Sequence, residues 1–219
     1  MRIIAGARKG RMLAAPSGTT TRPTADRVRQ AVFDILLHAP WGGPDLLNGA
    51  RVLDAFAGTG ALGLEALSRG ADYATFFEKD RPALAALRAN IAGCRWEDRS
   101  KVIPRDVTKP THAPAPCSLL FLDPPYRQDL PARTLAALDA QGWIAPGAIA
   151  VIETAAQEPL PLRLENAEEA DVPPPAAPAG EGEGEGEGEE TPPPPVYAGT
   201  LLAERKHGAA RLTLWRLKA

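Results

Sequence analysis

A glycine-rich turn between an apolar run and a helical segment constrains the fold of this chain more than any other feature. Residues 51–56 (RVLDAF) are typical of a buried strand, 57–60 (AGTG) of a turn, and 61–70 (ALGLEALSRG) of a helix closed by Gly70. The same alternation continues downstream. Strands that alternate with helices of about ten residues form a mostly parallel sheet with helices on both faces. The sequence therefore predicts an α/β protein.

The later elements follow from the same pattern. Asp80 is expected to cap a helix that has Pro82 in its first turn and Leu84, Leu87 and Ile91 on one face. A further helix is expected over 130–141, ending at Gly142. Further strands are expected at 73–79, 101–106, 118–123 and 148–153.

Both ends of the chain extend this core. Residues 1–16 suggest two short strands around Lys9-Gly10, so we expect a basic N-terminal hairpin arm over 1–22 and the main domain over 23–219. Thr24 is a candidate N-cap of a helix that reaches about His38. Residues 196–217 suggest two strands joined by a polar turn at Arg205–Gly208, an antiparallel hairpin that would complete the sheet.

An acidic and proline-rich stretch interrupts the domain at about 165–195. It contains EGEGEGEGEE followed by TPPPP and has almost nothing to bury, so we expect a disordered insertion. The acidic residues of this stretch also offset the positive net charge of the rest of the chain. Residues 164–203 carry ten acidic side chains and no Lys or Arg, and the rest of the chain holds 25 basic and 17 acidic groups, a net of +8. A basic body suits a polyanionic partner.

The glycine turn is a candidate cofactor site. Gly58, Gly60 and Gly63 match G-x-G-x-x-G, and Glu78 follows Gly58 by twenty residues. That spacing is typical of dinucleotide binding, which keeps an NAD-dependent dehydrogenase open as an alternative.

Asp54 argues for a different cofactor. A carboxylate four residues before Gly58 would repel a pyrophosphate, whereas S-adenosylmethionine carries an ammonium and a sulfonium that a carboxylate attracts. Glu78 would accept hydrogen bonds from the ribose hydroxyls, and Asp106, at the end of the third strand, from the adenine amino group. The alternative role of Asp54 is a helix cap or an ion-pair partner.

A second motif, Asp123-Pro124-Pro125-Tyr126, follows a strongly apolar strand. It therefore lies at the sheet edge where open α/β proteins bind ligands. Asp123 and the Pro124 carbonyl would accept hydrogen bonds from an exocyclic amino group of a base, and Tyr126 would stack on a base turned out of its helix. The alternative is a proline-stiffened turn, with Asp123 as a cap and Tyr126 as a packing residue.

The N-terminal thirty residues are strongly basic, with a net charge of +6 against a single acidic residue, Asp26. Such density suits contacts with RNA phosphates. The alternatives are a solvated charged face and an ion pair between Asp26 and Arg29. The candidate RNA-binding residues are Arg2, Arg8, Lys9, Arg11, Arg22, Arg27 and Arg29.

Taken together, these motifs resemble the bacterial 16S ribosomal RNA guanine-N2 methyltransferases named for guanine(966), usually called the RsmD family. The matching pieces are MRIIAG and KGR near the start, RPTADRVR at 22–29, VLDAFAGTGALGLEALSRGA at 52–71, EKD at 78–80, FLDPPY at 121–126 and the closing hairpin. They span nearly the whole chain except 160–195. D-P-P-Y alone is also shared with adenine-N6 and cytosine-N4 DNA methyltransferases.

The resemblance implies a class I methyltransferase fold, which is Rossmann-like, with S-adenosylmethionine as methyl donor and a guanine of 16S rRNA in the small ribosomal subunit, or in its assembly intermediate, as acceptor. It implies a cytoplasmic enzyme, and we expect a monomer without a metal or a membrane partner. The family pattern falls on Asp54, Phe56, Gly58, Gly60, Glu78 and Asp106 for the cofactor and on Asp123, Pro124, Pro125 and Tyr126 for the base. The open alternatives are a DNA amino-methyltransferase, the dehydrogenase, and a non-catalytic ribosome-assembly factor.

Overall fold

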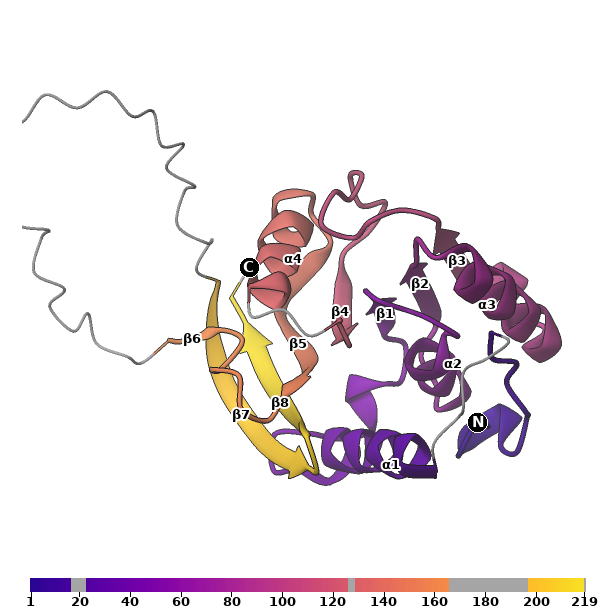
Figure 1. The fold of residues 1–219 in the computed structure, drawn as a ribbon, viewed down its shortest axis with the longest axis horizontal. Helices are drawn as coiled ribbons and strands as arrows, with labels where there is room; N and C mark the ends of the chain where they lie inside the picture. Colours follow the sequence, from indigo (N-terminus) through magenta and orange to yellow (C-terminus); the bar gives the residue numbers. More distant parts are fainter. Residues whose placement is uncertain (17–22, 126–128, 166–196, 219) are drawn as a thin grey trace, which may run out of the picture.

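A computed structural model describes residues 1–16, 23–125, 129–165 and 197–218. Its eight strands form one sheet in the order β3-β2-β1-β4-β5-β8-β7-β6 (Figure 1). The strands are β1 (Arg51–Asp54), β2 (Tyr73–Phe77), β3 (Ser100–Ile103), β4 (Cys117–Leu122), β5 (Ile144–Ala155), β6 (Arg163–Leu164), β7 (Ala198–His207) and β8 (Ala210–Leu217). The α-helices are α1 (Pro23–His38), α2 (Ala61–Ser68), α3 (Arg81–Cys94) and α4 (Leu130–Ala140).

The sheet has a parallel half and an antiparallel half. Strands β3, β2, β1, β4 and β5 pair in parallel, and β8 then pairs antiparallel with both β5 and β7. The predicted C-terminal hairpin is therefore confirmed. The two-residue strand β6, parallel to β7 at the outer edge, was not predicted.

Side chains that alternate along the central strands belong to two hydrophobic cores, one on each face of the sheet. Val52, Phe76, Phe121 and Val151 pack with α1, α2 and α3 on one face, whereas Leu120 belongs to the core under α4 on the other. The helices lie on both sides of the sheet, as predicted (Figure 1). Within the described ranges, no helix is long and apolar enough to span a bilayer.

The N-terminal segment differs from the expected hairpin. It reverses direction and brings Arg2 opposite Met12, but this is an isolated bridge, and residues Gly6–Arg8 form a short 3-10 helix. Backbone bonds join its two halves, from Ile3 N–H to Arg11 O at 2.9 Å and from Leu13 N–H to Met1 O at 3.1 Å, while the side chain of Glu65 on α2 accepts the N–H groups of Ile4 and Ala5 at 2.7 and 3.0 Å.

Element boundaries show two smaller differences. Helix α1 begins at Pro23, so Thr24 lies inside the helix and is not its N-cap. Strand β3 ends at Ile103, which leaves Asp106 in the loop that follows. The expected cap of α3 is confirmed, because Asp80 Oδ2 accepts the N–H of Ala83 at 3.0 Å. The acidic stretch from 166 to 196 lies outside the described residues.

Candidate active site

Three carboxylates lie on one face of the sheet, at the C-terminal ends of three neighbouring strands. Asp54 ends β1 and pairs in register with Phe121, and Phe121 pairs in turn with Val151. Glu153 lies two residues after Val151 on β5 and therefore points to the same face, and Asp123, which directly follows β4, lines the same cavity as Asp54 and Glu153. That face is covered by α1, whose Phe33 ring lies 5.7 Å from the ring of Phe121. The sequence motifs around Asp54 and Asp123 are therefore neighbours in space.

Asp54 is nearly inaccessible and has an unusual protonation equilibrium. Its side chain is 3% exposed, and Oδ2 accepts the backbone N–H of Gly63 at 3.0 Å. Gly63 lies in the first turn of α2, whose N-cap residue Gly60 has no side chain to supply such a bond. Burial raises the pKa of Asp54 to about 7, and the charges of Asp123 and Glu78 act in the same direction. Asp54 thus has the capping role that was left open, and it also lines a cavity.

The glycine turn is held in a conformation that opens it toward the cofactor site. Gly58 and Gly60 have φ values of +52° and +80°. A Cβ at Gly58 would project into open space, whereas one at Gly60 would lie 2.4 Å from Leu87 Cδ1. Glu78 fixes the turn, since its Oε2 accepts the N–H of Gly58 at 2.7 Å.

A first cavity of about 460 Å³ lies between the glycine turn and the loop after β3. Its polar wall includes Glu78 and Asp106, and Phe77 and Val107 provide apolar surface. Asp106 accepts from Thr108 and pairs with Lys79 Nζ at 2.7 Å, and these bonds lower its pKa to about 2. The cavity therefore offers carboxylate acceptors beside apolar walls, which suits an adenosine.

A second cavity of about 590 Å³ adjoins the first under α1. Phe56, Gly58 and Asp123 line both cavities, so the two form one continuous cleft. Asp54 and Glu153 line only the second cavity. Its remaining walls come from α1 and α2, from the turn between β7 and β8, and from Met1.

The double-proline motif stands where the two cavities meet. Asp123 is accessible from the cleft, and the protein around it raises its pKa. Pro124 is buried and Pro125 is exposed. Tyr126, the expected stacking residue, lies outside the described residues, and its role remains a prediction.

Glu153 is the site residue that sequence reasoning missed. It lies near the end of β5, half-buried, and burial together with the charge of Asp123 raises its pKa to about 7. A signal was available, because Glu153 ends a buried apolar run just as Asp54 and Asp123 do. The same rule applied to β5 would have found it.

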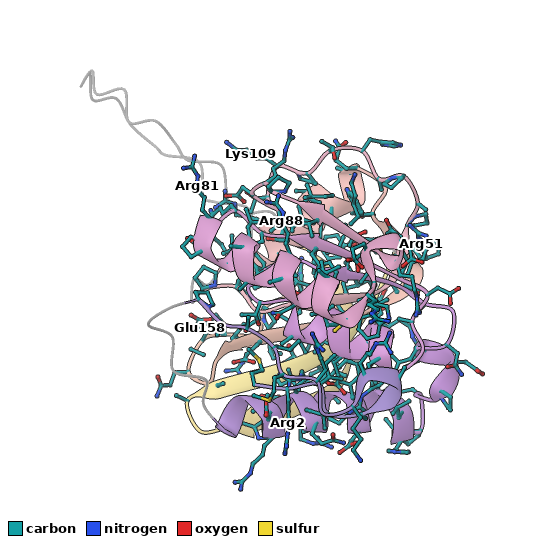
Figure 2. The ribbon with its side chains drawn as sticks, turned by 90° about the vertical axis from the view of Figure 1, so that its right-hand side faces the viewer. Arg2, Arg51, Arg81, Arg88, Lys109 and Glu158 are labelled. Atoms are coloured by element: carbon teal, nitrogen blue, oxygen red, sulfur yellow. The ribbon has the colours of Figure 1, made fainter. Side chains whose placement is uncertain are left out.

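The candidate RNA-binding residues do not form one uniform group. Arg2, Lys9 and Arg11 are exposed, as is Arg27 on α1. Arg8 is exposed too, but its Nε donates to Cys94 O at 2.9 Å and its guanidinium lies over the ring of Trp96. In Figure 2, Arg2 lies beside α1 and faces the same side of the molecule as Arg88 on α3.

The prediction that Arg29 contacts RNA is wrong for this structure. Its side chain is 4% exposed and pairs with Asp26 at 2.9 Å, the alternative that was left open. It also donates to Arg2 O at 2.6 Å and lies 3.7 Å from the carboxylate of Glu65. A guanidinium held this way is part of the core. Arg22 lies outside the described residues.

The cleft fits S-adenosylmethionine. Carboxylates at Glu78 and Asp106 suit the ribose hydroxyls and the adenine amino group, and the open backbone at Gly58 allows close approach. In its ionised form Asp54 would attract the positive charge of S-adenosylmethionine and would oppose the pyrophosphate of NAD.

The parallel sheet, the glycine turn and this cleft define the class of protein as S-adenosylmethionine-dependent methyltransferase. The family model described as "Conserved hypothetical protein 95" matches residues 1–172. The chain belongs to this family, which is the RsmD family that the sequence motifs resemble.

Relatives agree with that assignment. Ribosomal RNA small subunit methyltransferase D of Escherichia coli (strain K12) is 37% identical over 161 residues, which is 74% of this chain and 78% of the relative. The YlbH protein of Bacillus subtilis (strain 168) is 39% identical over 132 residues, 58% of this chain and 68% of the relative. Among solved structures, yhhF from Escherichia coli superimposes with a TM-score of 0.70 at 29% identity, covering 100% of this chain and 98% of that one.

Proposed function

We propose that this protein transfers a methyl group from S-adenosylmethionine to the exocyclic N2 of a guanine in 16S rRNA of the small ribosomal subunit. The observation that carries the proposal is the shared cleft, because Asp54 and Asp123 line one cavity and Gly58 and Asp123 join it to the next. The names of the relatives support ribosomal RNA as the substrate. The basic residues near the N-terminus support a polyanionic partner.

The residues of the cleft address the main chemical difficulty. The exocyclic nitrogen of guanine is a poor nucleophile, since its lone pair is delocalised into the ring. Asp123 and the Pro124 carbonyl would accept its two N–H bonds, orient the nitrogen and help to localise that lone pair. S-adenosylmethionine, when bound, supplies an electrophilic methyl group. Positioning and electrostatics then account for most of the acceleration.

Asp123 is also placed to take the proton that the nitrogen loses. A new N–C bond leaves the amine with one proton too many, and a nearby carboxylate or water removes it. The raised pKa of Asp123 makes it a better base than an ordinary aspartate.

The decisive experiment incubates the purified protein with methyl-labelled S-adenosylmethionine and small ribosomal subunits that lack native methylation. We expect label on N2 of a guanine in 16S rRNA, mapped by nuclease digestion and mass spectrometry. Label on DNA or on protein glutamine would overturn the substrate assignment. Thermal stabilisation by NAD in place of S-adenosylmethionine would overturn the cofactor as well.

A variant separates an enzyme from a ribosome-assembly factor. Asp123→Ala should reduce methyl transfer by about 100-fold or more while RNA affinity changes little, because positioned polar groups contribute on this scale to catalysis. An assembly factor would keep its full effect on subunit maturation with this substitution.

A further inference from the structure

Glu153 and Asp123 line the same cavity, and Glu153 takes no part in the methyl transfer proposed for Asp123 and Pro124. Ile152 of β5 pairs in register with Leu122, the last residue of β4, so Glu153 and Asp123 are the residues that directly follow this pair. Glu153 is half-buried and lines the second cavity. Within the described part of the chain its carboxylate forms no hydrogen bond or ion pair. Its accepting capacity is therefore available to a ligand.

The surroundings of Glu153 do not neutralise it. Arg29 is the cation of α1 at this cavity, and its guanidinium is engaged by Asp26 and by the carbonyl of Arg2. The titratable and charged residues lining the same cavity are Asp54, Asp123, His207, Arg29 and Met1 with its α-amino group.

The second cavity also has apolar walls, which a planar base requires. Val28 and Val32 of α1 lie on it, together with Leu62 of α2 and Leu212 of β8. A base held between such apolar groups presents its edge to the strand ends. Adjacent strands lie roughly 4.8 Å apart, close enough for two carboxylates to contact neighbouring atoms of one base edge.

The edge of guanine differs from that of every other amino-bearing base. Guanine has a donor, N1–H, next to its exocyclic amino group. Adenine and cytosine instead have a ring nitrogen with a lone pair next to theirs. A carboxylate beside the group that binds the amino nitrogen accepts a hydrogen bond from N1–H of guanine. The same carboxylate repels the ring-nitrogen lone pair of adenine or cytosine.

We propose that Glu153 is the specificity-determining residue that selects guanine, by accepting a hydrogen bond from N1–H while Asp123 holds the neighbouring amino group. This inference rests on the proposed function and extends it to a named residue. It also gives a physical reason why a D-P-P-Y motif, which by itself suits any exocyclic amine, would here serve guanine. A site that accepts a hydrogen bond from a donor on its substrate rejects an analogue without that donor, because the buried acceptor of the protein is then left unpaired.

The selection depends on the ionised form of Glu153. Its pKa of about 7, raised by burial and by the charge of Asp123, means that the carboxylate predominates only above neutral pH. When protonated, Glu153 donates a hydrogen bond and suits a ring acceptor. Discrimination should therefore increase from pH 6 to pH 8.

The test uses 2-aminopurine, which keeps the 2-amino group but has an acceptor at N1. Small subunits are reconstituted with guanine or 2-aminopurine at the methylated position, and kcat/KM is measured for the wild type and for Glu153→Gln. We expect the preference for guanine to fall about 10- to 100-fold in the variant, since Gln can accept or donate. The loss of the guanine O6 affects the wild type and the variant alike. The change in the kcat/KM ratio between the two proteins therefore reports the effect of N1 alone.

The control is Glu97→Gln, which removes an exposed carboxylate in the 3-10 helix Glu97–Arg99, away from the cleft, and should leave the ratio unchanged. Far-ultraviolet circular dichroism and the affinity for S-adenosylmethionine check that Glu153→Gln is folded. Should it not fold, the wild-type preference between pH 6 and pH 8 is the second test, and a flat profile would overturn the inference.

The outcomes are distinguishable. Equal preference for guanine in the wild type and in Glu153→Gln would overturn the role of Glu153 and leave the proposed function intact. Absence of label on either base with the wild type would overturn both.

Discussion

The backbone N–H of Gly63 donates a hydrogen bond to Oδ2 of Asp54 at 3.0 Å, which ties the end of β1 to the start of α2. Asp54→Asn keeps an oxygen for this bond and removes the charge. We expect the affinity for S-adenosylmethionine to fall about 10- to 100-fold, in line with the loss of a charge-assisted contact. S-adenosylhomocysteine, which lacks the sulfonium charge, should lose less. Isothermal titration calorimetry with both ligands measures the difference, and an equal loss for both would contradict a contact between the charge of Asp54 and the sulfonium.

The raised pKa of Asp54 makes the cofactor-free protein less stable at high pH. A carboxyl group whose pKa is about 7 when folded and 3.8 when unfolded binds more protons in the folded state between these values. Its contribution to stability is thus present at low pH and is lost as pH rises toward 7, with a change on the order of 4 kcal/mol. Urea unfolding from pH 5 to pH 8 should show the larger part of this decline, and Asp54→Asn should flatten it. A variant with the wild-type slope would assign the decline to other groups.

Glu65 is expected to hold the N-terminal segment onto α2. It is fully buried, pairs with Arg69 at 2.7 Å and accepts from the N–H groups of Ile4 and Ala5. Glu65→Ala leaves Arg69 and Arg29 without this partner, and we expect a loss of about 3–5 kcal/mol in the free energy of unfolding.

Urea denaturation measures that loss, and trypsin should then cleave the N-terminal segment faster. Asp26→Ala is the matched control, because it removes the more exposed partner of Arg29 and should cost much less. A loss below about 1 kcal/mol for Glu65→Ala, the scale of a surface pair, would show that the segment is held by other contacts.

The exposed N-terminal cations should contribute to RNA binding through phosphates. Lys9→Ala and Arg11→Ala are each expected to weaken binding to the small subunit and to reduce the slope of log K against log salt by roughly 0.7–0.9. Filter binding at salt concentrations from roughly 50 to 200 mM measures that slope. Lys101→Ala removes an exposed cation on β3 and is the control. An unchanged slope in both arm variants would limit RNA contact to other surfaces.

Much of the fold could be predicted because the pattern of apolar residues and caps is local. The cap at Asp80 and the alternation from β1 to β5 depend on neighbours in sequence. Strand β6 could not be predicted, since Arg163 and Leu164 are both exposed and two residues show no periodicity. The docking of the N-terminal segment could not be predicted for a different reason. The N–H groups of Ile4 and Ala5 donate to Glu65, about sixty residues away in the sequence, and a local pattern does not contain those contacts.

The candidate site was predictable where a motif marked it. Asp54 and Asp123 each end an apolar run and the sheet register brings them together. Glu153 carries the same signal without a family motif around it, and so it was missed. Arg29 was misassigned because charge alone does not distinguish an exposed guanidinium from one that is buried by long-range partners.

Strand β6 and the start of β7 hold together the two sides of the sequence stretch 166–196. Arg163 N–H donates to Tyr197 O at 3.0 Å, and Glu165 N–H donates to Gly199 O at 3.1 Å. This junction lies at the opposite end of β7 from His207, which lines the second cavity. A reporter domain inserted between positions 166 and 196 should therefore leave methyl transfer unchanged.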